Sequence, residues 1–363
     1  MRKFFSAKEI FTGQEFLRDH TVVVNEGKIE NLISSADAPA DRIENFDGCT
    51  LAPAFIDVQV YGAAGKLFAR YPEPWTLRTM QEVFFSQGTI LFQPTLATNT
   101  NEVFRRSIDA LRKYWAEGGK GIPGLHLEGP WLNPKKRGAH VEAWIHPPTM
   151  EEVRALLDYG GDTIRMITIA PEVCSEEIIQ FILSRGIIVS AGHSDITYDQ
   201  AIKCFDAGIP AVTHLYNAMS SLHHRAPGLV GAAFTHRRVV SAIIPDGHHV
   251  DFAAIKIAKE LMGSRLFAIT DAVTETLEGP YRHQLAGDKY ECDGILSGSS
   301  LSMHKAFVNL VRKVGIDKGE ALRMCSLYPA RLLLCDDRYG KIAPEYDASL
   351  LVLGSDLGLL RII

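Results

Sequence analysis

The sequence predicts an α/β fold in which a (β/α)8 TIM barrel is joined to a small β-sandwich built from both chain termini. Three observations support this fold class. Short apolar segments alternate with helical patterns through the middle of the chain. Both ends of the chain contain short strand patterns separated by turns. A length of 363 residues suits one large barrel with a small accessory unit better than several domains of equal size.

The expected barrel strands are short apolar runs of the kind that is buried on both faces of a parallel sheet. They span residues 55–60, 89–96, 123–128, 165–170, 187–193, 211–214, 239–245 and 266–271. Helical patterns lie between them, for example at 149–160, 175–186 and 197–208. Each of these three begins with Ser or Thr followed by acidic or amide residues and ends in Gly, which are helix start and stop signals. The alternation predicts a barrel of parallel strands.

The two ends of the chain carry a different pattern. Residues 21–33 alternate in polarity around a Glu-Gly turn, which is typical of a β-hairpin. Residues 339–356 have the same character. We therefore expect residues 1–52 to form the first part of the β-sandwich, residues 53–334 the catalytic barrel, and residues 335–363 the second part of the sandwich.

Composition excludes several classes of partner and location. The net charge is -5 and the pI is about 6.2, so there is no electrostatic reason to expect nucleic acid or an anionic membrane surface as a partner. No window reaches the length of a membrane span, and the apolar start of the chain is broken too early for a signal peptide. The six cysteines are scattered and form no C-x-x-C pair, which favours reduced thiols in the cytoplasm.

Ionisable residues stand at the ends of four expected strands: Glu128, His193, His214 and Asp271. The carboxyl ends of barrel strands converge on one face, so these side chains can meet. One Glu and two His suit a borderline metal such as zinc, and three protein ligands leave a fourth position for water. Taken singly, each residue has a structural alternative, since Glu128 could cap a turn and Asp271 a helix. Their joint placement favours a catalytic metal site.

The same residues indicate amide hydrolysis without a covalent intermediate. A metal lowers the pKa of water towards neutrality, and a carboxylate such as Asp271 can accept its proton and later protonate a departing amine. The sequence has no G-x-S-x-G elbow, and its scattered cysteines show no sign of activation. We therefore favour a metal-activated water over a Ser or Cys nucleophile.

Six segments, in order and spacing, resemble the N-acetylglucosamine-6-phosphate deacetylases of the amidohydrolase superfamily. They are APAFIDVQVYGAAG (52–65), HLEGPWLNPKKRGAH (126–140), GHSDITYDQA (192–201), THLYNAMSSLHHRAPGLVG (213–231), ITDAV (269–273) and LSGSSLSM (296–303). The similarity extends over nearly the whole chain. It implies a barrel of the metal-dependent hydrolase type, removal of an acetyl group from a phosphorylated amino sugar, one divalent metal per subunit and a homodimer with phosphate contacts that cross between subunits.

The resemblance also implies roles for individual residues. Glu128, His193 and His214 match the metal ligands, Asp271 the general base and acid, and His140 a residue near the amide carbonyl. The matching substrate contacts are Ala139, His140, Asn217, Ala218, Arg225, His249, Leu296, Ser297 and Gly298. Arg225 matches a phosphate-binding Arg, which suits its guanidinium group. Zinc fits the ligand set, and iron, cobalt or manganese can occupy the same donors.

One position departs from many amidohydrolases. A His-x-His pair often ends the first barrel strand, whereas this chain has Gln59-Val60-Tyr61, and the fourth strand ends in TIAPE without a bridging Lys. An amide is a poor zinc ligand and a phenol is normally protonated, so we expect a single-metal site. The change also speaks against a cyclic amidohydrolase such as a dihydroorotase or hydantoinase. A binding protein that has lost catalysis is the remaining alternative, but the residues of the proposed machinery are all present.

Overall fold

The structure is a computed structural model that describes residues 2–363, and its chain divides into two compact units. The terminal unit runs up to Ile56 and includes Phe84–Ile90 and Met303–Ile363. The barrel unit comprises Asp57–Val83 and Leu91–Ser302. Within the described residues, no helix is long and apolar enough to cross a membrane. The predicted domain boundaries after residues 52 and 334 stay a prediction.

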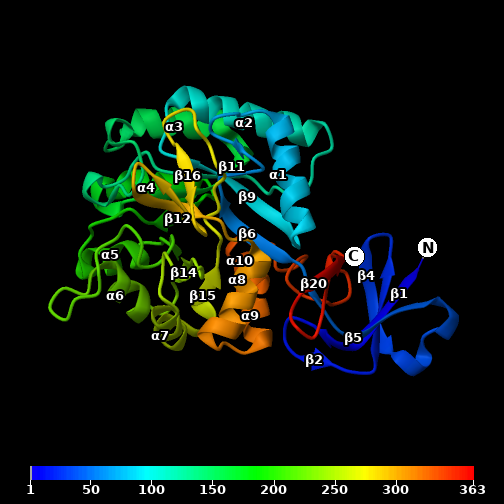
Figure 1. Cartoon of the computed structure of the whole chain (residues 1–363). Helices are drawn as coiled ribbons and strands as arrows, with labels where there is room; N and C mark the ends of the chain where they lie inside the picture. The colour runs from blue at the N-terminus through cyan, green and yellow to red at the C-terminus, as the bar shows by residue number, and fades with distance from the viewer. Residues whose placement is uncertain (1) are drawn as a thin grey trace. The chain divides into compact units, whose positions relative to one another are not determined.

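Eight strands form the barrel, in the order in which they occur along the chain (Figure 1). They are β6 (Phe55–Val60), β9 (Thr89–Ala97), β10 (Leu125–Glu128), β11 (Ile164–Ile169), β12 (Ile188–Ala191), β13 (Ala211–Val212), β14 (Val240–Ile243) and β15 (Leu266–Ala268). The ring closes where the segment after β15 bonds to β6: the Asp271 N–H donates to the Gln59 carbonyl at 3.0 Å, and the Tyr61 N–H to the Ala272 carbonyl at 2.8 Å. The predicted TIM barrel is confirmed.

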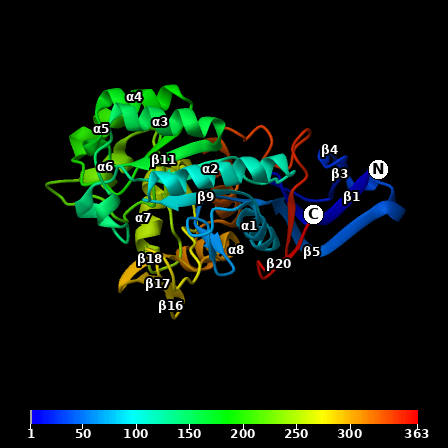
Figure 2. The same ribbon diagram turned by 90° about the horizontal axis from the view of Figure 1, so that it is seen from above.

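Helices follow the strands around this barrel (Figure 2). They are α1 (Pro74–Ser86), α2 (Asn101–Ala116), α3 (Met150–Gly160), α4 (Glu176–Ser184), α5 (Tyr198–Asp206), α6 (Gly228–Thr235) and α7 (Phe252–Met262). The three start signals found in the sequence are N-caps: the side chains of Thr149, Ser175 and Thr197 accept backbone N–H groups of α3, α4 and α5. Thr197 completes a capping box with Gln200.

The barrel interior contains a polar layer beneath the carboxyl ends of the strands. The His126 Nε2 lies 2.7 Å from the Thr168 hydroxyl, which lies 2.7 Å from the Thr213 hydroxyl, and Ser190 is 2.6 Å from Thr213. All four side chains are buried. Burial lowers the pKa of His126 to about 4, so this ring is neutral. His126 is therefore a structural core histidine, in contrast to the histidines at the strand ends.

The terminal unit contains one seven-stranded sheet shared by both ends of the chain. Its strands are β1 (Lys3–Phe11), β2 (Phe16–Leu17), β3 (His20–Asn25), β4 (Lys28–Ser34), β5 (Ile43–Pro53), β19 (Leu350–Leu353) and β20 (Leu359–Ile362). All pairs are antiparallel except β1 with β5. The predicted hairpin is β3–β4, which turns at Glu26 and Gly27 with positive φ at both. The unit also contains α8 (Met303–Asn309), a π-helix (Leu310–Val314), α9 (Lys318–Cys325) and α10 (Leu327–Leu332).

The barrel unit also contains two small sheets that the strand pattern did not predict. The strands β16 (His283–Ala286), β17 (Lys289–Cys292) and β18 (Ile295–Ser299) form an antiparallel sheet (Figure 2). The strands β7 (Gly62–Ala63) and β8 (Lys66–Leu67) form a second, two-stranded sheet. The first of these, which we call the inserted sheet, lies between β15 and α8 in the sequence and supplies residues to the cavity described next.

Candidate active site

Glu128, His193 and His214 meet at the carboxyl ends of the barrel strands. The Glu128 Oε1 lies 3.2 Å from the His193 Nε2 and 3.0 Å from the His214 Nε2, and the two nitrogens lie 3.1 Å apart. All three residues are buried. Around a tetrahedral zinc ion with bonds of about 2.0–2.1 Å, neighbouring donor atoms lie about 3.3 Å apart. The spacing of these three donors therefore fits a metal ion.

The hydrogen bonds of His193 support this fit. Its Nδ1 lies 2.8 Å from the carbonyl oxygen of Lys136, which only accepts, so Nδ1 carries the proton. In the neutral form of the ring, which is the form that binds a metal, the His193 Nε2 presents a lone pair towards the Glu128 carboxylate. Burial would raise the pKa of Glu128, but the charge of His193 and the histidine hydrogen bonds hold that pKa well below its usual range. A lone pair facing an ionised carboxylate is repulsive unless a cation lies between them.

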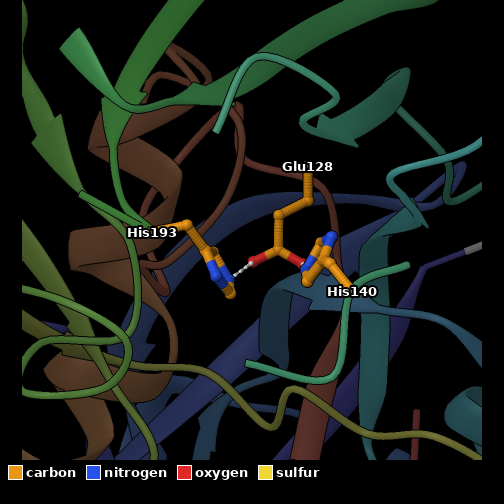
Figure 3. A group of neighbouring side chains, drawn as sticks. All are labelled: Glu128, His140 and His193. Atoms are coloured by element: carbon orange, nitrogen blue, oxygen red, sulfur yellow. Dashed lines mark hydrogen bonds and ion pairs between the residues drawn. The ribbon is translucent and has the colours of Figure 1, made fainter. Parts of the chain in front are cut away.

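His140 differs from the other two histidines in the proton that it carries. The Thr98 N–H donates to the His140 Nδ1 at 3.2 Å, so the His140 Nε2 carries the proton and donates to the Glu128 Oε2 at 3.1 Å. Figure 3 shows the Glu128 carboxylate between the rings of His140 and His193. By the distances between their possible ligand atoms alone, Glu128, His140 and His193 form a set that could bind a metal ion. Because the His140 Nε2 is a donor, we favour His214 as the third ligand and His140 as a hydrogen-bond donor.

Gln59 and Tyr61 hydrogen-bond to the Glu128 carboxylate. The Tyr61 phenol donates to the Glu128 Oε2, and the Gln59 amide nitrogen donates to the Glu128 Oε1 at 3.0 Å and to the Tyr61 oxygen at 2.8 Å. Burial and the charges of Asp271 and Glu128 raise the pKa of Tyr61 well above its usual value, so the phenol keeps its proton. Sequence analysis left these residues without a role. In the structure they orient a carboxylate and do not add a second pair of imidazoles.

We expect Tyr61→Phe to weaken zinc binding by about 10- to 100-fold without unfolding the protein, because hydrogen bonds to a ligating carboxylate fix its orientation. Competition with a chromogenic zinc chelator measures the affinity. Tyr290→Phe is the matched control, since Tyr290 packs against the same apolar cluster as Tyr61. Equal zinc affinity of Tyr61→Phe and the wild-type protein would contradict the orienting role.

Asp271 brings a carboxylate beside this cluster. Its Oδ1 is buried and has no hydrogen-bond partner among the described residues. Burial and the charge of Glu128 raise the pKa of Asp271 well above its usual value. A bound cation acts in the opposite direction and favours the ionised carboxylate. The group is therefore placed to exchange a proton with a molecule in the cavity.

The backbone at the strand ends is unusual. His193, His214 and Asp271 have φ of 48°, 30° and 55°, a left-handed conformation that costs a non-glycine residue about 1–2 kcal/mol. Backbone hydrogen bonds hold two of these turns in place: the His193 carbonyl accepts the Asn133 N–H at 3.0 Å, and the Asp271 carbonyl accepts the Ser299 N–H at 2.9 Å. Such turns direct consecutive strand-end side chains into one site.

A cavity of about 200 Å³ opens beside the cluster. Of the substrate contacts predicted from the sequence, the structure brings eight to its wall: Ala139, His140, Asn217, Ala218, His249, Leu296, Ser297 and Gly298. Gly298 has φ of 65°, and a Cβ there would lie 2.3 Å from a Val273 side-chain atom, so this close approach requires glycine. Arg225 is exposed and is not among the residues that line the cavity.

His249 is fixed by a carboxylate that sequence analysis missed. The Asp246 Oδ2 lies 2.6 Å from the His249 Nδ1, and the Asp246 Oδ1 accepts the backbone N–H groups of His248 and His249 at 2.9 and 2.8 Å. Burial would raise the pKa of Asp246, but the hydrogen bond and charge of His249 lower it overall. The pairing fixes the orientation of the His249 ring, which lines the cavity.

Further lining residues were also missed: Tyr61, Ala97, Ile244, Val273, Tyr281 and His283. Tyr61, Val273 and Tyr281 belong to one buried apolar cluster that also includes Leu67. The spacing of Asp246 and His249, three residues apart beyond a predicted strand, was a signal that could have been read as a charge pair. Tyr281 and His283 lie between residues 273 and 296, where no motif was recognised.

The comparisons with known proteins agree with this geometry. Residues 50–360 match the amidohydrolase family, and residues 7–48 match the NagA composite domain. The N-acetylglucosamine-6-phosphate deacetylase of Haemophilus influenzae is 33% identical, covering 94% of this chain and 93% of that protein. The N-acetylgalactosamine-6-phosphate deacetylase of Escherichia coli O157:H7 is 31% identical, covering 98% and 96%.

Solved structures are similar over the whole chain. The N-acetylglucosamine-6-phosphate deacetylase of Pasteurella multocida superposes with a TM-score of 0.95 at 32% identity, covering 100% of this chain and 98% of that one. A mutant of the Mycobacterium smegmatis enzyme, solved with N-acetyl-D-glucosamine-6-phosphate, gives 0.92 at 28% identity, covering 100% and 97%. The chain belongs to the amidohydrolase family, within its group of N-acetylglucosamine-6-phosphate deacetylases.

Proposed function

We propose that this chain hydrolyses the acetamide of N-acetyl-D-glucosamine 6-phosphate to D-glucosamine 6-phosphate and acetate, a step of amino-sugar catabolism. The observation that carries the proposal is the convergence of Glu128 Oε1, His193 Nε2 and His214 Nε2 beside an unpaired carboxylate oxygen of Asp271. Relatives named for this activity, at 33% identity over nearly the full length, support the choice of substrate.

Glu128, His193 and His214 would hold one divalent cation, for which zinc is our first choice and iron, cobalt or manganese are alternatives. Such a cation acts as a Lewis acid that lowers the pKa of water and polarises the acetamide carbonyl. Gln59 and Tyr61 occupy the place where a second pair of ligands would stand, and both donate hydrogen bonds to Glu128. This arrangement supports a single ion per subunit.

Asp271 and His140 carry the proton movements that the reaction requires. Asp271 accepts a proton from the attacking water as the water oxygen bonds to the acetyl carbon. The His140 Nε2–H donates to the carbonyl oxygen as negative charge develops there. The carbon–nitrogen bond then breaks, Asp271 delivers its proton to the amine nitrogen, and the acetyl group leaves as acetate. All atoms of the water molecule are accounted for in the two products.

The wall of the cavity suits the parts of this substrate. The apolar side chains of Tyr61, Val273 and Tyr281 fit the acetyl methyl group. Asn217, Ala218, Leu296, Ser297 and Gly298 offer amide, hydroxyl and backbone groups to the sugar. No Lys or Arg lines the cavity among the residues that the structure describes, so the phosphate has no cationic Lys or Arg partner within one subunit.

We also propose that the protein is a homodimer in which Arg225 of the partner subunit binds the phosphate. Arg225 stands in the exposed stretch 221–226 and does not line the cavity of its own subunit. A guanidinium group binds phosphate through paired hydrogen bonds, and no Arg is among the described residues that line the cavity. A cytoplasmic location completes the proposal, and the six cysteines, which are scattered along the chain without a C-x-x-C pair, support it.

Arg225→Ala is expected to raise KM for the phosphorylated substrate by about 10- to 100-fold and to change kcat little, because a charged hydrogen bond contributes about 1.5–3 kcal/mol. Steady-state kinetics measure the effect, with Lys135→Ala, an exposed cation of another loop, as the control. Mixed dimers of Arg225→Ala and Asp271→Asn chains should regain activity, since one of their two sites has both residues intact. Absence of any recovery would contradict a contribution from the partner subunit.

The test of the proposed function is acetate release by the purified protein, with metal content measured on the same sample. We expect turnover of N-acetylglucosamine 6-phosphate, loss of turnover after chelation and recovery with zinc. Dihydroorotate serves as the comparison substrate for the cyclic-amidohydrolase alternative. Hydrolysis of dihydroorotate in place of the acetylated sugar would overturn the proposal.

A further inference from the structure

The inserted sheet supplies a histidine to the cavity that none of the steps above uses. His283 begins β16, and its side chain is buried, whereas those of its neighbours Arg282 and Gln284 are exposed. Tyr281 is also buried, so burial alternates over residues 281–284 and ends at Leu285, which is exposed. His283 lines the same cavity as the proposed metal ligands. The His283 imidazole is therefore positioned to contact a ligand in the cavity.

The orientation of the His283 ring is fixed on two sides. Its Nδ1 lies 3.2 Å from the Ser297 hydroxyl oxygen. The ring stacks on Tyr281, with centroids 6.3 Å apart and planes 12° apart, and the Tyr281 phenol donates to the Thr98 carbonyl at 2.5 Å. The ring also interacts with the Ser297 backbone, and the hydrogen bonds found among the described residues include none at the His283 Nε2. One ring nitrogen is therefore held by the protein, and the other is available to a molecule in the cavity.

The His283 ring is neutral. Burial lowers the pKa of His283 to about 4. A neutral imidazole nitrogen exchanges a hydrogen bond with a hydroxyl group but offers no charge to a phosphate dianion. The chemistry of the site thus matches a sugar hydroxyl.

The known relatives show why such a contact matters. Proteins named for N-acetylglucosamine 6-phosphate and for N-acetylgalactosamine 6-phosphate are 33% and 31% identical to this chain, so overall similarity does not separate the two sugars. These sugars differ only in the configuration at C4. The acetamide occupies C2 and the phosphate C6, which leaves hydroxyls at C1, C3 and C4, and only the hydroxyl at C4 distinguishes the two sugars.

We propose that His283 is a specificity-determining residue that binds the C3 or C4 hydroxyl of the amino sugar through its Nε2. The proposal rests on the proposed function and adds a contact to the same site. Ser297, through Nδ1, sets the ring so that Nε2 faces the sugar. A site built to hydrogen-bond a hydroxyl discriminates strongly against an analogue that lacks it, because its buried polar group is then left unpaired.

The test compares wild-type protein with His283→Phe on four substrates: N-acetylglucosamine 6-phosphate, its 3-deoxy and 4-deoxy analogues, and N-acetylgalactosamine 6-phosphate. For the parent sugar, His283→Phe should lower kcat/KM about 10- to 100-fold, mainly through KM, with zinc content unchanged. For the analogue that lacks the bound hydroxyl, wild-type and variant values should agree within about 2-fold, since the lost contact is then absent from both. If His283 binds the C4 hydroxyl, the ratio of kcat/KM between N-acetylglucosamine 6-phosphate and N-acetylgalactosamine 6-phosphate should also be smaller in His283→Phe than in the wild-type protein.

Two further substitutions separate a hydrogen bond from a change of shape. The Gln amide nitrogen reaches about as far as the imidazole Nε2. His283→Gln should therefore keep much of the difference in kcat/KM between the parent sugar and the analogue that lacks the bound hydroxyl, whereas the shorter His283→Asn should lose it. Gln284→Phe places a ring on the exposed face of the same strand and should leave kinetics unchanged. If His283→Phe lost kcat/KM equally on the parent sugar and on both deoxy analogues, or lost none on any of them, the role of His283 would be overturned. The proposed function would still stand. Failure of wild-type protein to deacetylate any of the four would overturn the proposed function with it.

Discussion

Asp271→Asn should retain one metal ion per chain and lose turnover by about 10²–10⁴-fold, the usual contribution of a positioned general base and acid. The substitution keeps the size of the side chain, and the backbone bonds that hold the turn, from Asp271 to Gln59 and from Ser299 to Asp271, do not involve the carboxylate. What is lost is the group that accepts a proton from water and returns it to the amine. Acetate release and metal analysis on the same preparation measure both quantities.

Asp293→Asn is a suitable control for this experiment. Asp293 also has a positive φ, of 50°, but it lies on an exposed turn of the inserted sheet and does not line the cavity. Asn tolerates the left-handed conformation as well as Asp does. We expect wild-type kinetics from this variant. An Asp271→Asn protein with full activity would exclude Asp271 as the base.

The second large effect distinguishes two histidines that both contact Glu128. His214→Ala should leave the purified protein with well under one zinc ion per chain, because it removes one of three ligands. His140→Ala should retain the ion and lose about 10²–10³-fold in kcat, since it removes a donor to the developing oxyanion. The reason for the difference is the proton on His140 Nε2, which the bond from the Thr98 N–H to His140 Nδ1 places there.

Elemental analysis and steady-state kinetics on the two variants give the comparison. Asn217→Ala is a useful control for local disturbance, because the Asn217 side chain bonds to the backbone carbonyls of His214 and Leu215. It should retain the metal. A metal-free His140→Ala together with a metal-loaded His214→Ala would transfer the ligand role to the set Glu128, His140 and His193.

The sequence predicted the barrel well, because strands buried on both faces leave a strong apolar signal. The strand at 55–60 was predicted at its observed bounds, and capping residues such as Thr149 and Ser175 located helix starts. The inserted sheet was not predicted. Its strands are mostly half-exposed and lack a continuous apolar run, for example Lys289–Cys292. Local pattern carries little information about strands that are covered on one face only.

The candidate site was predictable where chemistry and strand position coincide. Glu128, His193 and His214 stand at strand ends, and the structure brings their donor atoms within 3.2 Å of one another. Their roles as ligands stay a prediction. The contacts of Tyr61 with Glu128 and of Asp246 with His249 were not predictable in detail, because they depend on side-chain directions that residue spacing does not specify. His283 was missed for a further reason, since it comes from the inserted sheet.

The most direct test of the account is anomalous diffraction at the zinc edge from crystals of the zinc-loaded protein. The account predicts a single peak per chain, bounded by the Glu128 carboxylate and by the Nε2 atoms of His193 and His214, with Asp271 beside it. A peak bounded by His140 in place of His214, or a second peak next to Gln59 and Tyr61, would contradict it.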